Sequence, residues 1–108
     1  MRTHRSIDER SLAMARAIAA KIDADPGHGG VQRARAICER WERLSPSPNH
    51  REWLEILRKP WAEIRAILLE DSEEGRRRRQ NSPFCGILTS KERWSIYRRF
   101  QELEKAGP

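Results

Sequence analysis

The densest cluster of charge in the sequence is a run of four arginines: Arg76, Arg77, Arg78 and Arg79. Guanidinium groups bind phosphate well, so the run is a candidate contact for nucleic acid or for an acidic partner. Successive residues of a helix point about 100° apart, however, so these side chains cannot share one face. Residues 70–79 also hold four acids, and Glu73–Arg77 and Glu74–Arg78 are i,i+4 pairs. We therefore expect a self-paired, solvated short helix, with phosphate or partner contact as the alternative.

A second set of cations lies near the end of the sequence: Lys91, Arg98, Arg99 and Lys105. Lys91, Arg98 and Lys105 are seven residues apart, so on a helix they form one stripe, which we expect opposite an aromatic face. Such a stripe matches the shape of a phosphate backbone better than the arginine run does. An ordinary solvated face is the leading interpretation, and contact with phosphate is the alternative.

The segment that follows the arginines, residues 81–88, has the features of an ordered apolar loop. Ser82 precedes Pro83 and must therefore be extended. Gly86 allows a turn with positive φ between Phe84 and Leu88, which can anchor the loop on the core. We expect the loop to hold the last helix against the bundle. The alternative is that it presents Phe84 to a partner.

Arg43 and His50 enclose six residues, and this spacing resembles the R-x(4–6)-H motif of HEPN ribonucleases, which are also small helical domains. The resemblance implies that the two side chains contact a scissile RNA phosphate together. Here Pro46 and Pro48 interrupt the segment, and Leu44 stands where a polar residue is usual. A ribonuclease is therefore the last of our three functional hypotheses.

No other residues have the spacing of a catalytic or metal site. The three histidines are isolated from cysteines and carboxylates at metal-ligand spacing. Two distant cysteines, Cys38 and Cys85, make no disulfide framework, and we expect reduced thiols. Cys85 is expected to be a small apolar loop residue, with a reactive thiol as the alternative. We expect no enzymatic activity, no metal and no cofactor.

Helical periodicity predicts an all-α fold, a compact bundle of five to six short helices. Residues 1–5 are expected to be a flexible tail and residues 6–108 a single helical domain. The expected helices cover about residues 6–22, 30–44, 49–58, 60–71, 73–80 and 90–105. A single helix kinked at Pro60 is the alternative to the third and fourth. Side-chain caps are expected at Ser6, Asn49, Ser72 and Thr89.

Aromatic residues are expected on the inner faces of these helices. Each of the four tryptophans lies among apolar residues at helical spacing, which favours core positions for Trp41, Trp53, Trp61 and Trp94. An exposed stacking platform or a contact for a protein partner is the alternative. On the last helix, the expected inner face consists of Trp94, Ile96, Tyr97, Phe100 and Leu103.

The composition fits one highly charged domain. The sequence has 108 residues, of which 37% are apolar and 35% charged. Its net charge of +6 favours anionic partners without identifying one. No apolar run approaches the roughly 18 residues of a membrane span, and no segment is typical of a signal peptide. We expect a cytoplasmic protein that does not bind membranes.

Several short motifs, spread over most of the chain, resemble those of a family of small uncharacterised bacterial helical proteins. The family pattern has an Arg-Ser opening, a central tryptophan helix pair and a close of the form RQ-x-SPF-x-G-x-L … RW. The matching positions here are Arg5-Ser6, Trp53, Arg79-Gln80, Ser82-Pro83-Phe84, Gly86, Leu88 and Arg93-Trp94. The resemblance implies an antitoxin-like protein, the small partner in a toxin–antitoxin-type gene pair. It implies no catalytic residues.

These observations give a ranked set of functions. We expect a non-enzymatic protein-interaction module, an antitoxin or regulatory partner of a protein encoded nearby. The first alternative is a nucleic-acid-binding helical protein that uses Lys91, Arg98, Arg99 and Lys105, with help from Arg76–Arg79. The second is the HEPN-like ribonuclease. The candidate docking residues of the loop are Ser82, Pro83, Phe84, Gly86 and Leu88.

Overall fold

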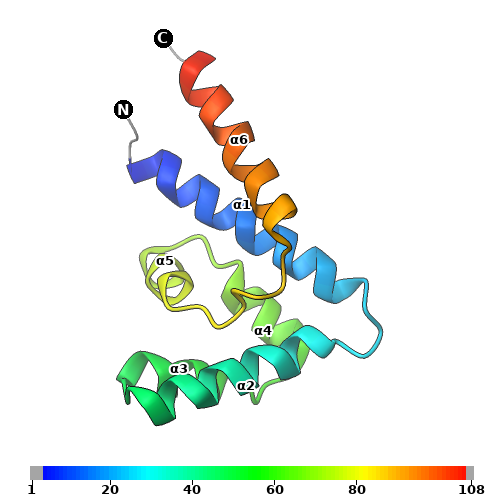
Figure 1. The fold of residues 1–108 in the computed structure, drawn as a ribbon. Coiled ribbons are helices and arrows are strands. Elements are labelled where there is room, and N and C mark those ends of the chain that lie inside the picture. The colour runs from blue at the N-terminus through cyan, green and yellow to red at the C-terminus, as the bar shows by residue number, and fades with distance from the viewer. Residues whose placement is uncertain (1–3, 107–108) are drawn as a thin grey trace.

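The computed structural model describes the backbone of residues 4–106 and the side chains of residues 8–103 and 105. This part of the chain contains helices and no strand, so the all-α prediction is confirmed (Figure 1). The helices are α1 (His4–Asp23), α2 (Gly29–Leu44), α3 (Pro48–Ile56), α4 (Trp61–Leu68), α5 (Glu73–Gln80) and α6 (Ser90–Ala106). Within the described residues, none of these helices has the length and apolar character needed to cross a bilayer.

The helices form a bundle with one projecting arm. The α2–α3 hairpin lies at one end, α4 and α5 lie above it, and α1 crosses over them (Figure 1). The last helix, α6, packs along α1 and extends away from the α2–α3 hairpin. The described chain measures 45 × 30 × 24 Å. One side of α6 consequently faces solvent along its length.

Trp53 is at the centre of the core. Its side chain is 1% exposed, and its ring meets the edge of Phe84 at a centroid distance of 5.9 Å. The indole Nε1 donates a hydrogen bond of 2.9 Å to the carbonyl oxygen of Arg78, so burial leaves no polar atom of this side chain unsatisfied. Trp53 belongs to one buried cluster with apolar residues from α1, α2, α3 and its C-cap, α4 and the 81–88 loop: Ala15, Ile22, Ala34, Cys38, Ile56, Leu57, Ile64, Leu68, Phe84 and Ile87.

Two predicted helix starts are wrong. The first helix begins at His4, so His4 and Arg5 are helical rather than a tail and Ser6 is not the capping residue. Residues 1–3 of the expected tail lie outside the described residues. The third helix is capped by Ser47, whose hydroxyl accepts a hydrogen bond from the Asn49 amide at 3.2 Å. Pro48 favours this start, because proline has the backbone angle and the missing N–H that suit a first helical position.

The other helix starts in the structure agree better with those predicted from the sequence. Ser72 caps α5 by accepting a hydrogen bond from the Gly75 amide at 3.0 Å, as predicted. α3 and α4 are separate helices, so the kinked single helix is wrong, and Pro60 is the N-cap of α4 rather than its first residue. α4 ends at Leu68, not at residue 71.

The start of α6 is fixed by a capping box that also holds the helix to α1. The Thr89 hydroxyl accepts a hydrogen bond from the Glu92 amide at 3.1 Å, and the Glu92 carboxylate accepts one from the Thr89 amide at 2.7 Å. The Lys21 ammonium of α1 donates to the same carboxylate oxygen at 2.7 Å. Hydrogen bonds from Lys21 and from Thr89 lower the pKa of Glu92 to about 2.

We expect Glu92→Gln to lower the stability of the protein at pH 7, because the amide keeps the shape but loses the charge. A carboxyl with a lowered pKa stabilises the fold above its unfolded pKa of 4.5 and loses that effect as the pH falls toward about 2. The urea midpoints of the two proteins should therefore differ at pH 7 and converge between about pH 4.5 and pH 2. Glu102→Gln, at an exposed position of the same helix, is the control. A difference that does not change with pH would contradict this account.

Candidate functional site

The four arginines of α5 point to different parts of the molecule. Arg76 reaches α1, where its Nε lies 3.3 Å from a carboxylate oxygen of Asp8. Arg77 reaches α3 and binds Glu52 through two hydrogen bonds of 2.9 Å each. It also pairs with Glu74 at 2.8 Å, rather than with Glu73 as predicted. These hydrogen bonds lower the pKa of Glu52 and raise that of the Arg77 guanidinium.

Arg78 and Arg79 complete this divergent arrangement. Arg78 lies 3.4 Å from Glu52, 3.7 Å from Glu70 and 3.9 Å from Glu74, and the last of these is the predicted i,i+4 pair. Arg79 turns inward and donates to the Ser11 hydroxyl and to backbone carbonyls. The arginine run thus links α5 to its neighbours, and it does not form one basic surface.

We expect Arg77→Ala to destabilise the fold more than Arg58→Ala does. Arg58 forms one exposed pair with Glu55 at 3.3 Å, and pairs of that kind contribute little. Arg77 makes a bidentate, charge-assisted contact between two helices, and its loss leaves Glu52 with only the weaker contact to Arg78. Urea midpoints of the two variants at pH 7 provide the measurement. Equal midpoints would mean that the contacts of Arg77 with Glu52 and Glu74 do not contribute measurably to stability.

The 81–88 loop is part of the core. Pro83 and Phe84 are fully buried, and the Phe84 ring lies between Trp53 at 5.9 Å and Trp61 at 6.5 Å. The Ser82 hydroxyl accepts a hydrogen bond from the Phe84 amide at 3.2 Å, and Leu88 is also buried. In this conformation the apolar side chains of the loop face inward, which favours the scaffold interpretation over docking.

The expectation of a positive φ at Gly86 is wrong. No glycine among the described residues has a positive φ. The turn is closed by a hydrogen bond of 3.5 Å from the Ile87 amide to the Phe84 carbonyl. Turns of the commonest type close in this way with negative φ at both central residues, so Gly86 is not required for its backbone angles.

One face of α6 combines cations with an exposed aromatic ring. Trp94 is 57% exposed, so its predicted core position is wrong. It follows Lys91 by three residues and precedes Arg98 by four, which places it on the basic stripe rather than opposite it. Ile96 is the residue of this helix that is buried. We call Lys91, Trp94, Arg98 and Lys105 the α6 outer face.

The cations of this region have no acidic partner among the described side chains. Among the described side chains, no ion pair involves Lys91, Arg98, Arg99 or Lys105, and all four are exposed. Arg99 lies over the Phe100 ring, with its guanidinium carbon 5.7 Å from the ring centre. Leu103 is 61% exposed toward the free end of the arm. The α6 arm therefore combines unpaired positive charge with accessible apolar surface.

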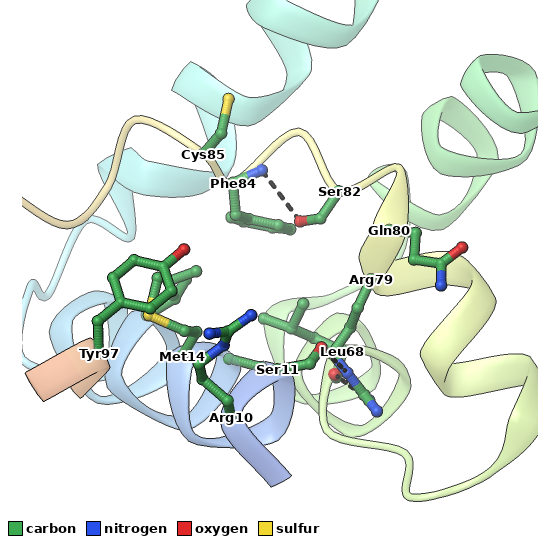
Figure 2. A pocket seen from close by; sticks show the side chains of 12 residues that line it. Arg10, Ser11, Met14, Leu68, Arg79, Gln80, Ser82, Phe84, Cys85 and Tyr97 are labelled. Carbon is green, nitrogen blue, oxygen red and sulfur yellow. Dashed lines mark hydrogen bonds between the residues drawn. The ribbon is translucent and has the colours of Figure 1, made fainter. Parts of the chain in front are cut away.

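A cleft of about 360 Å³ opens between α1, the 81–88 loop and α6 (Figure 2). Arg10 lies in it with its guanidinium carbon 4.8 Å from the centre of the Tyr97 ring. Arg79 and Ser11 form another part of its wall. The sequence did not predict this site. Its lining residues are distributed over five segments of the chain, and no local pattern connects them.

The residues of the HEPN-like hypothesis lie at the end of α2 and in the first turn of α3. Arg43 is exposed, whereas His50 is half-buried with its ring 5.7 Å from that of Trp41. The Nδ1 atom of His50 is buried without a hydrogen-bond partner among the described atoms. No hydrogen bond joins Arg43 to His50 in the described part of the chain. A HEPN-like ribonuclease stays the last of the three functional hypotheses.

Neither a metal site nor a related protein guides the assignment further. The described side chains contain no cluster of three or more histidine, cysteine or acidic residues placed to bind a metal ion. Comparison with models of protein families, with curated proteins and with solved structures gives no match. The resemblance to the RQ-x-SPF family stays a prediction, and the functional argument rests on the geometry of this chain.

Proposed function

We propose that this protein is a non-enzymatic interaction module whose α6 outer face binds an acidic protein partner. Specifically, we propose that the chain is the antitoxin-like, regulatory member of a bacterial two-gene system and that its partner is encoded nearby. The observation that carries it is Trp94, a large aromatic side chain that is 57% exposed and lies among cations that have no acidic partner among the described side chains.

The residue types of this face support protein binding. Tryptophan and arginine are the residues most enriched among those that dominate binding energy at protein interfaces. Trp94 and Arg98 are four residues apart on one helix, so a partner can bury the ring and pair the guanidinium in a single contact. The arm projects from the bundle, so a partner can reach this face without displacing the core (Figure 1).

Charge also favours an acidic partner. The arginines of α5 already have partners within the chain, whereas the cations of the outer face have no acidic partner among the described side chains. An acidic surface would therefore be attracted to α6 rather than to α5, and complementary charge accelerates association and selects the partner.

The test is affinity purification of the full chain from its native host, followed by purification with the product of the neighbouring gene. We expect a stoichiometric complex that Trp94→Ala and Arg98→Glu each weaken at least about tenfold, since truncation of such residues costs 2 kcal/mol or more. Leu44→Ala and Arg40→Glu are the matched controls, because both side chains are exposed on α2, away from the arm. A chain that purifies without a stoichiometric partner, or controls that weaken binding equally, would refute the proposal.

Nucleic-acid binding by the same face is the second candidate, and the position of Trp94 favours it as well. An exposed aromatic ring beside cations can stack on an unpaired base while the cations bind phosphates. If Lys91, Arg98, Arg99 and Lys105 each neutralise one phosphate, log K should fall with log salt at a slope of about −3.6 on duplex DNA, or about −2.8 on a single strand, where the ring can stack on a base. Binding that is undetectable at low salt, or insensitive to salt, excludes this candidate.

A further inference from the structure

We propose that the cleft between α1, the 81–88 loop and α6 binds a small organic carboxylate with a flat apolar body. This inference is separate from the proposed function, because no residue of the α6 outer face lines the cleft. Its volume of about 360 Å³ is at the small end of the range for ligand pockets, roughly 300–1,000 Å³.

Among the described residues, the lining of the cleft carries positive charge and no negative charge. Arg10 and Arg79 are its two ionised residues, and neither aspartate nor glutamate lines it. Arg10 rests against the Tyr97 ring and forms no ion pair with a described side chain. In Figure 2 its guanidinium lies in the middle of the cleft, between Tyr97 and Leu68.

Among the described residues, the groups that bind Arg79 are neutral. Its Nε donates to the Ser11 hydroxyl at 3.0 Å, and its Nη1 donates to the carbonyl oxygens of Leu68 at 3.3 Å and Glu70 at 2.7 Å. Its Nη2 is buried without a hydrogen-bond partner. Burial lowers the pKa of this guanidinium, although Asp71, Asp8 and Glu70 attract it from farther away. The guanidinium is thus partly desolvated and forms no direct ion pair with a described side chain, and a bound anion would offset part of the cost of that desolvation.

The remaining lining defines the rest of the ligand. Tyr97, Met14, Ile18 and Leu68 form apolar walls, and the Ser82 hydroxyl adds a polar group at the loop. A guanidinium binds a carboxylate through two parallel hydrogen bonds, and an aromatic wall favours a flat apolar body. A carboxylate attached to a ring or to a short hydrocarbon chain satisfies both requirements.

The test is a titration of the full chain with benzoate, followed by ¹H–¹⁵N correlation spectra. Acetate, which has the charge without the ring, and benzyl alcohol, which has the ring without the charge, are the comparison ligands. We expect benzoate to bind about 10- to 100-fold more tightly than either, with the largest shifts at Ala15, Cys85 and Tyr97. Equal binding of the three ligands, or shifts centred on the α6 outer face, would overturn the proposal.

Variants locate the charge that binds the carboxylate. Arg10→Gln should weaken benzoate binding about tenfold or more, and Arg16→Gln, at an exposed position of the same helix, should leave it within about twofold. An unchanged affinity in folded Arg10→Gln contradicts the proposal. The comparison of the three ligands uses the native chain, so it tests the proposal even if the Arg10→Gln variant does not fold. Trp94→Ala should bind benzoate normally, which separates this proposal from the proposed function.

Discussion

Replacement of Phe84 by alanine should lower the free energy of unfolding by about 3–5 kcal/mol, the usual cost of removing a buried phenylalanine ring. The Phe84 side chain is 0% exposed and contacts the rings of Trp53 and Trp61, so its removal leaves a cavity at the centre of the core. A loss of this size is a large fraction of the stability of a small domain, about 5–15 kcal/mol. Urea unfolding followed by tryptophan fluorescence and by circular dichroism measures it.

Two further variants separate the scaffold and docking interpretations of this loop. Phe84→Leu, which keeps much of the volume, should cost less than Phe84→Ala. Cys85→Ala, at the exposed neighbouring position, should change stability by no more than about 0.5 kcal/mol. The contrary result would be a Phe84→Ala variant that has the same urea midpoint as the unmodified protein but no longer binds a protein partner. The loop would then be a docking site, and the argument from burial would be wrong.

Gly75→Ala should destabilise the protein by about 1–3 kcal/mol or more, the cost of overpacking a closely packed site. Replacement of a helical glycine by alanine normally stabilises a protein, by up to about 1 kcal/mol, so the effect expected here has the opposite sign. A Cβ atom at position 75 would lie 1.9 Å from the carbonyl oxygen of Glu70, which is backbone and cannot rotate away. The backbone around Glu70 or α5 itself must then move.

A second glycine provides the matched control. A Cβ atom at Gly86 would meet only the Ile37 side chain, at an ordinary distance of 3.9 Å, and its φ is not positive. Gly86→Ala should therefore be neutral or slightly stabilising, by up to about 1 kcal/mol. Thermal and urea unfolding of the two variants together test the argument. Equal stabilities of the two alanine variants would show that the space beside Gly75 adapts at no cost.

The parts of the fold that the sequence predicts correctly depend on local signals. A cap such as Ser72 or Thr89 binds amides within three residues, so the sequence contains both partners. The third helix shows the limit of this reasoning. Ser47 and Asn49 are both good capping residues, and the intervening Pro48 decides between them.

The exposure of Trp94 could not be deduced from periodicity. Apolar residues occupy more than one side of α6, so the pattern does not specify which side packs against α1. Ile96 and the capping box at Glu92 settle the orientation, since Glu92 binds Lys21, 71 positions earlier in the chain. The side opposite this contact is left exposed, and Trp94 lies there.

The contacts of the arginine run depend on tertiary structure as well. The divergence of the four side chains follows from helix geometry and was predictable. Their partners were not, because Arg77 and Glu52 are separated by 25 positions and Arg79 and Ser11 by 68. The cleft between α1, the 81–88 loop and α6 is missed for the same reason, since Arg10 and Tyr97 come from opposite ends of the sequence.

The close approach of Gly75 to Glu70 has a consequence for the rotational register of α5. Arg76 to Arg79 are chemically identical, so a rotation of the helix by one residue would bring another arginine into most of the same positions. The run alone therefore leaves the register degenerate. Gly75 removes the degeneracy, because only a residue without Cβ fits beside the Glu70 carbonyl, which Arg79 also binds at 2.7 Å. A residue without a side chain thus determines which arginine binds each partner.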